Sequence, residues 1–423
     1  MNSKEKVQAV LNHKEIEGIA VDFGATAVTG IHALAIENIR KHYGLEPKLV
    51  KIIEPYQMLG EVDEELMEIF DVDVVGLWSE RNMFGIVQDN YKEFKTHWGQ
   101  VVLVPGKMNT TVDTDGAFLV YAEGDTSYPA SAKMPTMSYF FDAIIRQDPF
   151  VEAELKIEDN LEEFGLWTDH DIAYWKKQAE SIKGTDKAVI ANFGGTGLGD
   201  IALVPAMNLK HPKGIRDIVE WYVSTAKRKD FIMEIFEAQT DIALSNLKKA
   251  FQIAGNMIDA VYICGTDFGT QNSTFCSPIT FQELYKPYYR KINDWIHENT
   301  SWKTFKHSCG AVENFMELFS DAGFDIINPV QINAKGMDPD LLKERHGQKL
   351  TFWGGGADTQ KALPFLTPKE VKDHVIRNCE IFSKSGGFVF NAVHNVQANV
   401  PVENIIAMID GLNEFNGRKN PFA

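Results

Sequence analysis

Cysteine is scarce in this chain, with four residues among 423, at positions 264, 276, 309 and 379. So few thiols in a chain of this length exclude a disulfide-based fold and indicate reduced cysteines in a reducing compartment. The sequence also lacks any run of about 18 or more apolar residues, which predicts no membrane-spanning helix. Residues 1–18 lack the apolar core of a signal peptide and instead predict an amphipathic helix capped by Ser3. We therefore expect a cytoplasmic protein.

Positive charge is in the minority. The chain has 42 Lys and Arg residues against 59 Asp and Glu residues, a formal net charge of −17 at pH 7. A field of this sign repels nucleic acid and anionic membranes, so we expect neither as a partner. Small-molecule substrates stay open, because a local basic pocket can exist inside an acidic protein. The 44% of hydrophobic residues is enough for a large core and excludes a disordered chain.

What the sequence does contain is a rhythm of short apolar, β-branched runs separated by longer segments of helical periodicity. The runs are residues 18–24, 72–78, 188–194, 260–269, 302–310, 325–331, 350–356 and 388–395. Such alternation indicates a parallel sheet covered on both faces. With eight strands, closure into a (β/α)8 (TIM) barrel of the α/β class is favoured, as one domain over residues 1–423. The alternative, an open doubly wound sheet, is disfavoured because no G-x-G-x-x-G fingerprint opens a strand–helix unit.

Two further features belong to this reading of the chain. Residues 215–254 predict two helices, and residues 278–297 predict a helix that Ser277 caps and Pro287 kinks. Residues 95–150 break the rhythm, because the segments 94–105 and 116–124 alternate like antiparallel strands, with turns at Pro105-Gly106 and Asp115-Gly116. We interpret this region as an inserted hairpin over one mouth of the barrel.

The sharpest chemical feature is Lys306-His307-Ser308-Cys309-Gly310, where a predicted strand runs into a helix. Side chains two apart on a strand point to one face, so His307 and Cys309 can converge on one ion. An imidazole with a thiolate suits Zn²⁺ in a catalytic site that keeps one position open. The alternative is a hydrogen-bonded histidine at the rim beside a cysteine that is simply a small buried residue.

A third ligand has to come from a neighbouring strand end. His394 follows the last predicted strand, which in a closed barrel returns beside the first. Taken alone, this histidine reads as an ordinary polar group at the start of a loop. All three residues nevertheless follow the carboxyl ends of strands, where barrel enzymes place their catalytic groups, and together they favour a metal site.

Other polar residues at strand ends are candidates for the same pocket. Asp267 can protonate a leaving group or orient a ligand, although a helix cap or a loop ion pair would also explain it. Asp22 and Gln331 are candidate substrate-binding residues at two other strand ends. Glu54 and Gln57 are weaker candidates, because the Pro55 between them is also typical of a surface turn.

At these residues the sequence resembles the uroporphyrinogen decarboxylase superfamily, which also contains zinc-dependent, corrinoid-linked methyltransferases. The resemblance covers most of the chain and is densest over 262–404. It rests on the segments 265–271, 277–278, 307–310, 328–331, 335–339, 351–355, 394–397 and 400–404. The resemblance implies a (β/α)8 barrel, in agreement with the strand count.

Two branches of the superfamily differ in their motifs. The decarboxylases carry an arginine-rich motif near the N-terminus that grips the substrate carboxylates, whereas residues 19–26 contain no arginine. The methyltransferase branch carries an H-x-C-G zinc motif, which His307-Ser308-Cys309-Gly310 matches. In the thiol methyltransferases of that branch the third ligand is a cysteine near the last strand, where this chain has His394. That difference favours an enzyme that takes methyl groups from a donor over one that uses a thiol acceptor.

The resemblance thus implies a zinc-dependent methyltransferase that moves a methyl group between a small methylated compound and the corrinoid of a separate protein. The direction of transfer and the identity of the methyl donor or acceptor stay open, and a homo-oligomer is allowed. His307, Cys309 and His394 would hold the zinc, and Asp267 would protonate or orient. A cofactor-free decarboxylase is the second hypothesis. A non-catalytic ligand-binding barrel is the third, and it would require His307 and Cys309 to be buried and turned away from the cavity.

Overall fold

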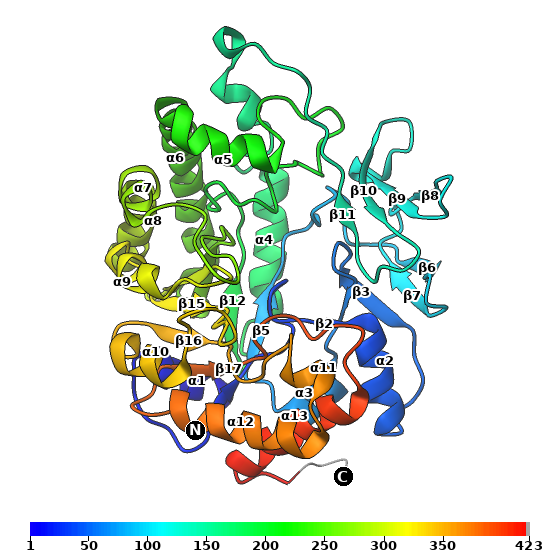
Figure 1. The fold of residues 1–423 in the computed structure, drawn as a ribbon, viewed down its shortest axis with the longest axis vertical. Helices are drawn as coiled ribbons and strands as arrows, with labels where there is room; N and C mark the ends of the chain where they lie inside the picture. Colours follow the sequence, from blue (N-terminus) through cyan, green and yellow to red (C-terminus); the bar gives the residue numbers. More distant parts are fainter. Residues whose placement is uncertain (420–423) are drawn as a thin grey trace.

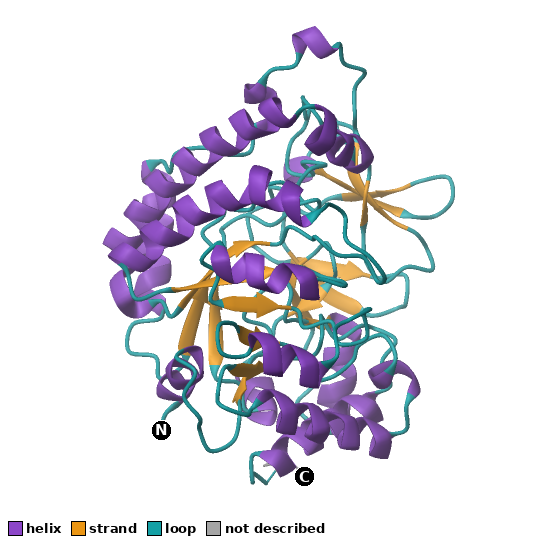
Figure 2. Cartoon of the chain, turned by 60° about the vertical axis from the view of Figure 1, so that its left-hand side comes forward, coloured by secondary structure: helices purple, strands orange, loops and turns teal. Residues whose placement is uncertain are grey.

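The computed structural model of the protein describes residues 1–419, and its centre is an eight-stranded parallel sheet. The strands are β1 (Ala20–Val21), β5 (Val74–Leu77), β12 (Ala188–Ala191), β13 (Ala260–Cys264), β14 (Lys303–His307), β15 (Ile326–Asn328), β16 (Thr351–Trp353) and β17 (Phe388–Phe390). Each of the eight apolar runs contains one of them, so the predicted strands are confirmed. Figure 2 shows these strands at the centre with helices around them.

The sheet closes on itself. Its order is β1-β17-β16-β15-β14-β13-β12-β5, so the first and last strands along this order are β1 and β5. Between them, the backbone N–H of Asp73 donates to the carbonyl oxygen of Val21 at 2.8 Å. The N–H of Val21 in turn donates to the Asp73 carboxylate at 2.9 Å. This contact bridges the gap, confirms the (β/α)8 barrel and rules out the open sheet.

The barrel interior is filled at its amino-terminal end. One buried cluster takes apolar side chains from all eight strands, among them Val74, Ile190, Phe305 and Trp353. Helix α1 (Ser3–Leu11) packs Val7, Val10 and Leu11 onto the same cluster. That end is therefore plugged, which leaves the carboxyl ends of the strands as the end where a site can form. The N-cap of α1 is Asn2, in a capping box with Glu5; the predicted cap at Ser3 was wrong by one residue.

The other helices follow the prediction closely where it was specific. They are α2 (Ala33–His42), α3 (Glu64–Phe70), α4 (Asp169–Ser181), α5 (Ile218–Lys227), α6 (Lys229–Ala254), α7 (Pro278–Thr280), α8 (Lys286–Asn299), α9 (Glu313–Asp321), α10 (Pro339–His346), α11 (Ala362–Phe365), α12 (Pro368–Phe382) and α13 (Val402–Phe415). Short 3-10 turns occupy Ala122–Gly124, Glu152–Glu154, Ile157–Asn160 and Gly255–Met257.

Ser277 caps α7, and a π-helical turn at Phe281–Tyr285 separates α7 from α8. This interruption precedes Pro287, which has no N–H to continue the helical ladder, as predicted for residues 278–297. No helix among the described residues is long and apolar enough to cross a membrane.

A mixed sheet and an antiparallel sheet flank the barrel, on the right of the molecule in Figure 1. One is ordered β2 (Ile31–His32), β4 (Leu59–Gly60), β3 (Val50–Glu54), β7 (Val101–Val104) and β6 (Lys92–Lys95), with β3 and β7 parallel. The other contains β8 (Thr110–Val112), β9 (Phe118–Tyr121), β10 (Ala130–Met134) and β11 (Asp142–Ala143).

The inserted region is therefore present but larger than predicted, because the strands β2, β3 and β4 join it. The run 94–105 is not one strand: the N–H of Thr96 donates to the Gln100 carbonyl at 2.9 Å, and the chain turns there through Gly99, whose φ is +86°. The turn predicted at Asp115-Gly116 does connect β8 to β9.

Candidate metal centre

The three residues predicted as metal ligands lie together at the carboxyl ends of their strands. His307 is the last residue of β14, Cys309 follows two residues later, and His394 follows β17. One ligand atom from each residue lies within 4.8 Å of the other two. The rings of His307 and His394 stand 5.4 Å apart between centroids, nearly perpendicular at 77°. Two strands that are distant in sequence thus contribute to one point.

His307 is held in the tautomer that a metal ligand needs. Its Nδ1 lies 2.6 Å from Oδ1 of Asn328, whose amide nitrogen already donates to the Trp353 carbonyl at 2.8 Å. The Asn328 oxygen must accept, so Nδ1 carries the proton and Nε2 keeps its lone pair. Nε2 faces the Cys309 sulfur at 3.4 Å. Burial, together with the Lys306 charge, lowers the pKa of His307 to about 4, so the ring is neutral at physiological pH.

Cys309 is placed by the glycine that follows it and by Asp267. Gly310 has a φ of +93°, and a Cβ at this position would lie 2.3 Å from the carbonyl carbon of Gly269, so only glycine fits. The backbone N–H of Cys309 donates to Oδ1 of Asp267 at 2.6 Å. Burial and the neighbouring Asp267 charge raise the pKa of the Cys309 thiol well above its usual range. Metal binding at this thiol therefore has to displace its proton.

His394 is neutral as well, because burial and the nearby His307 lower its pKa to about 3. Its Nδ1 accepts the backbone N–H of Asn395 at 2.8 Å. A neutral imidazole has one free lone pair, so the proton lies on Nε2. A metal ion can take the Nδ1 lone pair only in exchange for this hydrogen bond, or the Nε2 lone pair only after the proton has moved to Nδ1, which also ends this hydrogen bond. His394 is thus the ligand that must rearrange during loading.

Asp267 stands beside the cluster, three residues after β13. Besides its bond to Cys309, its Oδ1 lies 4.0 Å from Nε2 of His307. Burial raises the pKa of Asp267, and the Lys306 charge acts in the opposite direction. The buried Lys306 ammonium donates to the carbonyls of Thr266 at 2.6 Å and His307 at 2.5 Å. Its charge partly balances the carboxylate within the same strand ends.

The predicted substrate-binding residues differ in how close they come to this cluster. Gln331 is next to it, because its Oε1 accepts the N–H of Gly310 at 2.7 Å. Gln57 reaches the cluster only through Asn395, the residue after His394, because the Oε1 of Gln57 accepts from the side chain of Asn395 at 2.8 Å. Glu54 holds the turn before Gln57 by accepting that residue's N–H at 2.7 Å, and burial raises the pKa of Glu54 to about 7.

Asp22 has a different setting. It is fully buried, accepts the Trp353 indole N–H at 2.9 Å and the N–H of Ala25 at 3.1 Å, and thereby joins the ends of β1 and β16. None of these partners is a member of the cluster. Burial raises the pKa of Asp22 to about 6.

Two residues of the site were missed by the sequence reasoning. Asn328, which orients His307, ends β15, and its position at a strand end was the available signal. Asp200 follows the glycine-rich segment 194–199 after β12. Its Oδ2 accepts the N–H of Gly265 at 3.1 Å, and burial, then the Asp267 charge, raises the pKa of Asp200 to about 6. A second carboxyl thus lies close to the strand end that carries Asp267.

The donor set fits a zinc ion. Two imidazoles and one thiol are the atoms that Zn²⁺ prefers, and three protein ligands leave a fourth position open, as in catalytic zinc sites. Cys309 and His394 are half-buried, so the cluster is not sealed inside the core. The hydrogen bond from His307 to Asn328 is the kind of outer contact that orients a zinc-bound histidine.

Comparisons with known proteins agree with this fold. Thirty chains of known structure match it, among them a methyltransferase from Methanosarcina mazei with a TM-score of 0.53 and 13% sequence identity, which covers 98% of this chain and 99% of that one. No curated protein sequence matches the chain. The family model described as uroporphyrinogen decarboxylase (URO-D) matches residues 206–415, the part that carries Asp267, the H-x-C-G segment and His394. Over these residues, the chain is similar to the uroporphyrinogen decarboxylase family.

Proposed function

We propose that this protein is a zinc-dependent methyltransferase that moves a methyl group between a small methylated compound and a corrinoid carried by a partner protein. The observation that carries the proposal is the convergence of His307, Cys309 and His394 at the carboxyl ends of the barrel strands, with ligand atoms within 4.8 Å of one another. The resemblance of its motifs to the methyltransferase branch supports the choice of reaction. The solved methyltransferase from Methanosarcina mazei supports the barrel as a suitable scaffold.

The role of the three ligands is to hold the metal and leave one position for substrate. Bound zinc would act there as a Lewis acid on the heteroatom of the methylated compound. His307 enters this role in the right tautomer, because Asn328 accepts its Nδ1 proton. Cys309 can bind the metal only after its thiol has lost a proton, and burial otherwise keeps that proton on the thiol.

Asp267 is the proposed acid. Its Oδ1 is committed to the backbone N–H of Cys309, which leaves Oδ2 as the atom that can carry a proton. The raised pKa of this carboxyl favours the protonated form relative to an exposed aspartate. From this place Asp267 can donate a proton to the heteroatom as it loses its methyl group. In the opposite direction of transfer it would accept that proton.

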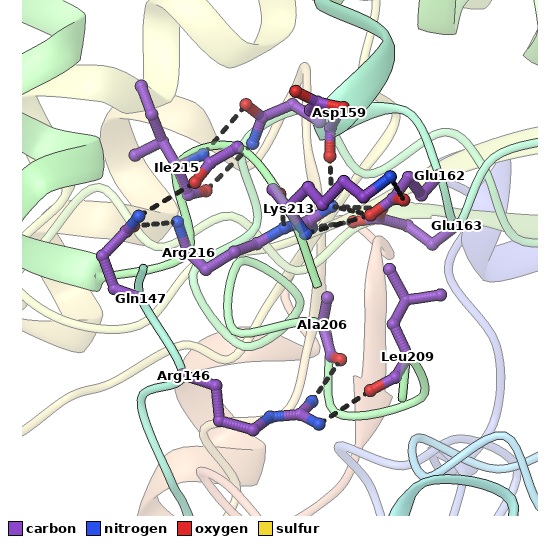
Figure 3. Close-up of polar contacts among 12 residues, drawn as sticks. Arg146, Gln147, Asp159, Glu162, Glu163, Ala206, Leu209, Lys213, Ile215 and Arg216 are labelled. Atoms are coloured by element: carbon purple, nitrogen blue, oxygen red, sulfur yellow. Dashed lines mark hydrogen bonds and ion pairs between the residues drawn. The ribbon is translucent and has the colours of Figure 1, made fainter. Parts of the chain in front are cut away.

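Two observations count against the alternatives. A decarboxylase of a polycarboxylate substrate needs free cationic donors. Two arginines at the segment between β12 and α5 already have protein partners (Figure 3). Arg146 donates to the carbonyls of Ala206 and Leu209. Arg216 forms a bidentate ion pair with Glu163. A non-catalytic barrel would need His307 and Cys309 both to be buried and turned away from the cavity. His307 is buried, but Cys309 is half-buried and its sulfur faces the Nε2 of His307.

The proposal is tested with free cobalamin as the corrinoid. Zinc-loaded protein is mixed with chemically reduced cobalamin and, in separate reactions, methanol, methylamines, methyl thioethers and aryl methyl ethers. We expect one of these classes of compound to form methylcobalamin in a zinc-dependent reaction. The absorption spectrum of methylcobalamin measures its formation. The reverse reaction starts from methylcobalamin and the demethylated compounds. Zinc-loaded, folded protein that neither forms nor consumes methylcobalamin in any of these reactions would contradict the proposed function.

A further inference from the structure

The segment that carries His394 is bound to the first part of the chain through the side chain of Asn395. Asn395 is fully buried. Its Oδ1 accepts the N–H of Gly30 at 2.6 Å, and its Nδ2 donates to the Ala27 carbonyl at 2.9 Å and to Oε1 of Gln57 at 2.8 Å. Every polar atom of this amide therefore has a partner outside its own loop.

Gln57 completes the arrangement from the other side. Its Nε2 donates to the same Ala27 carbonyl, at 3.2 Å, so the side chains of Gln57 and Asn395 both hydrogen-bond to one carbonyl oxygen. Its backbone N–H is fixed by the buried Glu54 carboxyl. The backbone after Asn395 is fixed too, because Val396 exchanges hydrogen bonds with Gly30 and His32 at 3.0 and 2.9 Å.

The link from this network to the candidate ligand is short. The backbone N–H of Asn395 is the group that bonds to Nδ1 of His394. Fixing the Asn395 side chain therefore fixes the backbone from which the imidazole projects. Neither Gln57 nor Asn395 contributes an atom to the His307, Cys309 and His394 cluster. Their bonds add nothing to metal binding directly and act only through the position of His394.

We propose that Gln57 is a positioning residue for the third metal ligand, acting through Asn395; this inference rests on the function proposed above. Because His394 must exchange its hydrogen bond when the metal binds, the surrounding backbone has to hold the ring near the cluster during that exchange. Loss of the Gln57 contact frees the Asn395 amide and, with it, the loop that carries His394. The effect is on the affinity and geometry of the metal centre and leaves the rest of the barrel unchanged.

The test uses the metal-free full chain and Co²⁺ alone as a spectroscopic probe for zinc. Gln57→Ala is expected to bind Co²⁺ about 10–100-fold more weakly than wild type, the usual cost of removing an outer contact of a metal ligand. Its visible d–d bands should lose the intensity typical of a four-coordinate site. Gln57→Met removes the same bonds at nearly the same volume and should behave alike. Gln57→Glu keeps the acceptor for Asn395 but loses the Nε2 donor to the Ala27 carbonyl, so it should recover only part of the affinity.

Gln100→Ala is the matched control. The Gln100 amide also donates to a backbone carbonyl, of Ala33 at 3.0 Å, and accepts a side-chain N–H, from Trp98 at 2.9 Å, but it has no link to the cluster. We expect wild-type affinity and spectrum. The inference is overturned if both Gln57→Ala and Gln57→Met bind Co²⁺ like wild type, or if Gln100→Ala loses as much. Wild-type protein that binds no Co²⁺ would overturn the proposed function itself, a failure recognised because it occurs before any substitution.

Discussion

Replacing Cys309 with alanine is expected to weaken zinc binding by about a thousandfold and to abolish methyl transfer. The apparent free energy of protein zinc sites is about 10–16 kcal/mol, and the loss of one of three ligands removes roughly a third of it, about 3–5 kcal/mol. When bound to zinc, the Cys309 sulfur is also the one anionic ligand among the three. Its loss therefore removes more than a third of the binding free energy. Zinc retained after dialysis against a chelator of known affinity measures the effect.

Cys276→Ala provides the control for this experiment. Cys276 is also a half-buried free thiol, and it is not among the three clustered residues. Its removal should leave zinc content at the wild-type level. If Cys309→Ala kept its zinc, or if Cys276→Ala lost as much as Cys309→Ala, the sulfur at 309 would not be a ligand.

The second large effect is expected for Asp267→Asn, which should slow methyl transfer by about 100–10,000-fold, the usual contribution of a general acid or base. The amide retains an oxygen for the Cys309 N–H but cannot give up a proton to a leaving group. The zinc affinity of this variant should rise or stay constant. The Asp267 charge raises the pKa of the Cys309 thiol, so removing that charge makes the thiolate easier to form. Single-turnover rates and zinc affinity are measured on the same preparation.

Asp259→Asn is the appropriate comparison for that variant. Asp259 is also a buried residue. Its carboxyl lies at the start of β13, opposite to the end that Asp267 follows, and accepts the N–H of Val189 at 2.9 Å. We expect its transfer rate to stay near wild type. A rate for Asp267→Asn within a few-fold of that of Asp259→Asn would remove Asp267 from the proton transfer.

The barrel could be predicted from sequence because of how parallel strands are buried. A strand covered on both faces reads as a continuous apolar run, as residues 188–191 do, and eight such runs leave few architectures open. Closure then places the loop after the last strand near the others, which is why His394 could be matched with His307. The flanking sheets were harder, because their half-buried strands are short. The turn at Gly99, for example, was signalled by a single glycine.

The outer contacts of the site could not be predicted for a different reason. Asn328 and Asn395 lie in segments that carry the family resemblance, but their roles depend on atoms supplied from elsewhere in the chain. Asn395 meets Gln57 across 338 positions of sequence. Gln57 was identified as a candidate site residue, whereas its amide contacts in the structure are with the protein itself. Spacing along a strand can indicate a ligand pair, but the partners that orient the pair are set by tertiary structure.

Zinc-edge X-ray absorption of the wild-type protein tests the central claim most directly, because it counts and identifies the atoms around the metal. We expect one sulfur at about 2.3 Å and two imidazole nitrogens at about 2.0–2.1 Å, with a light atom in the remaining position. The sulfur is that of Cys309, and the nitrogens belong to His307 and His394. A zinc shell without sulfur, or one with a single imidazole, would contradict the three-residue centre on which the proposed chemistry depends.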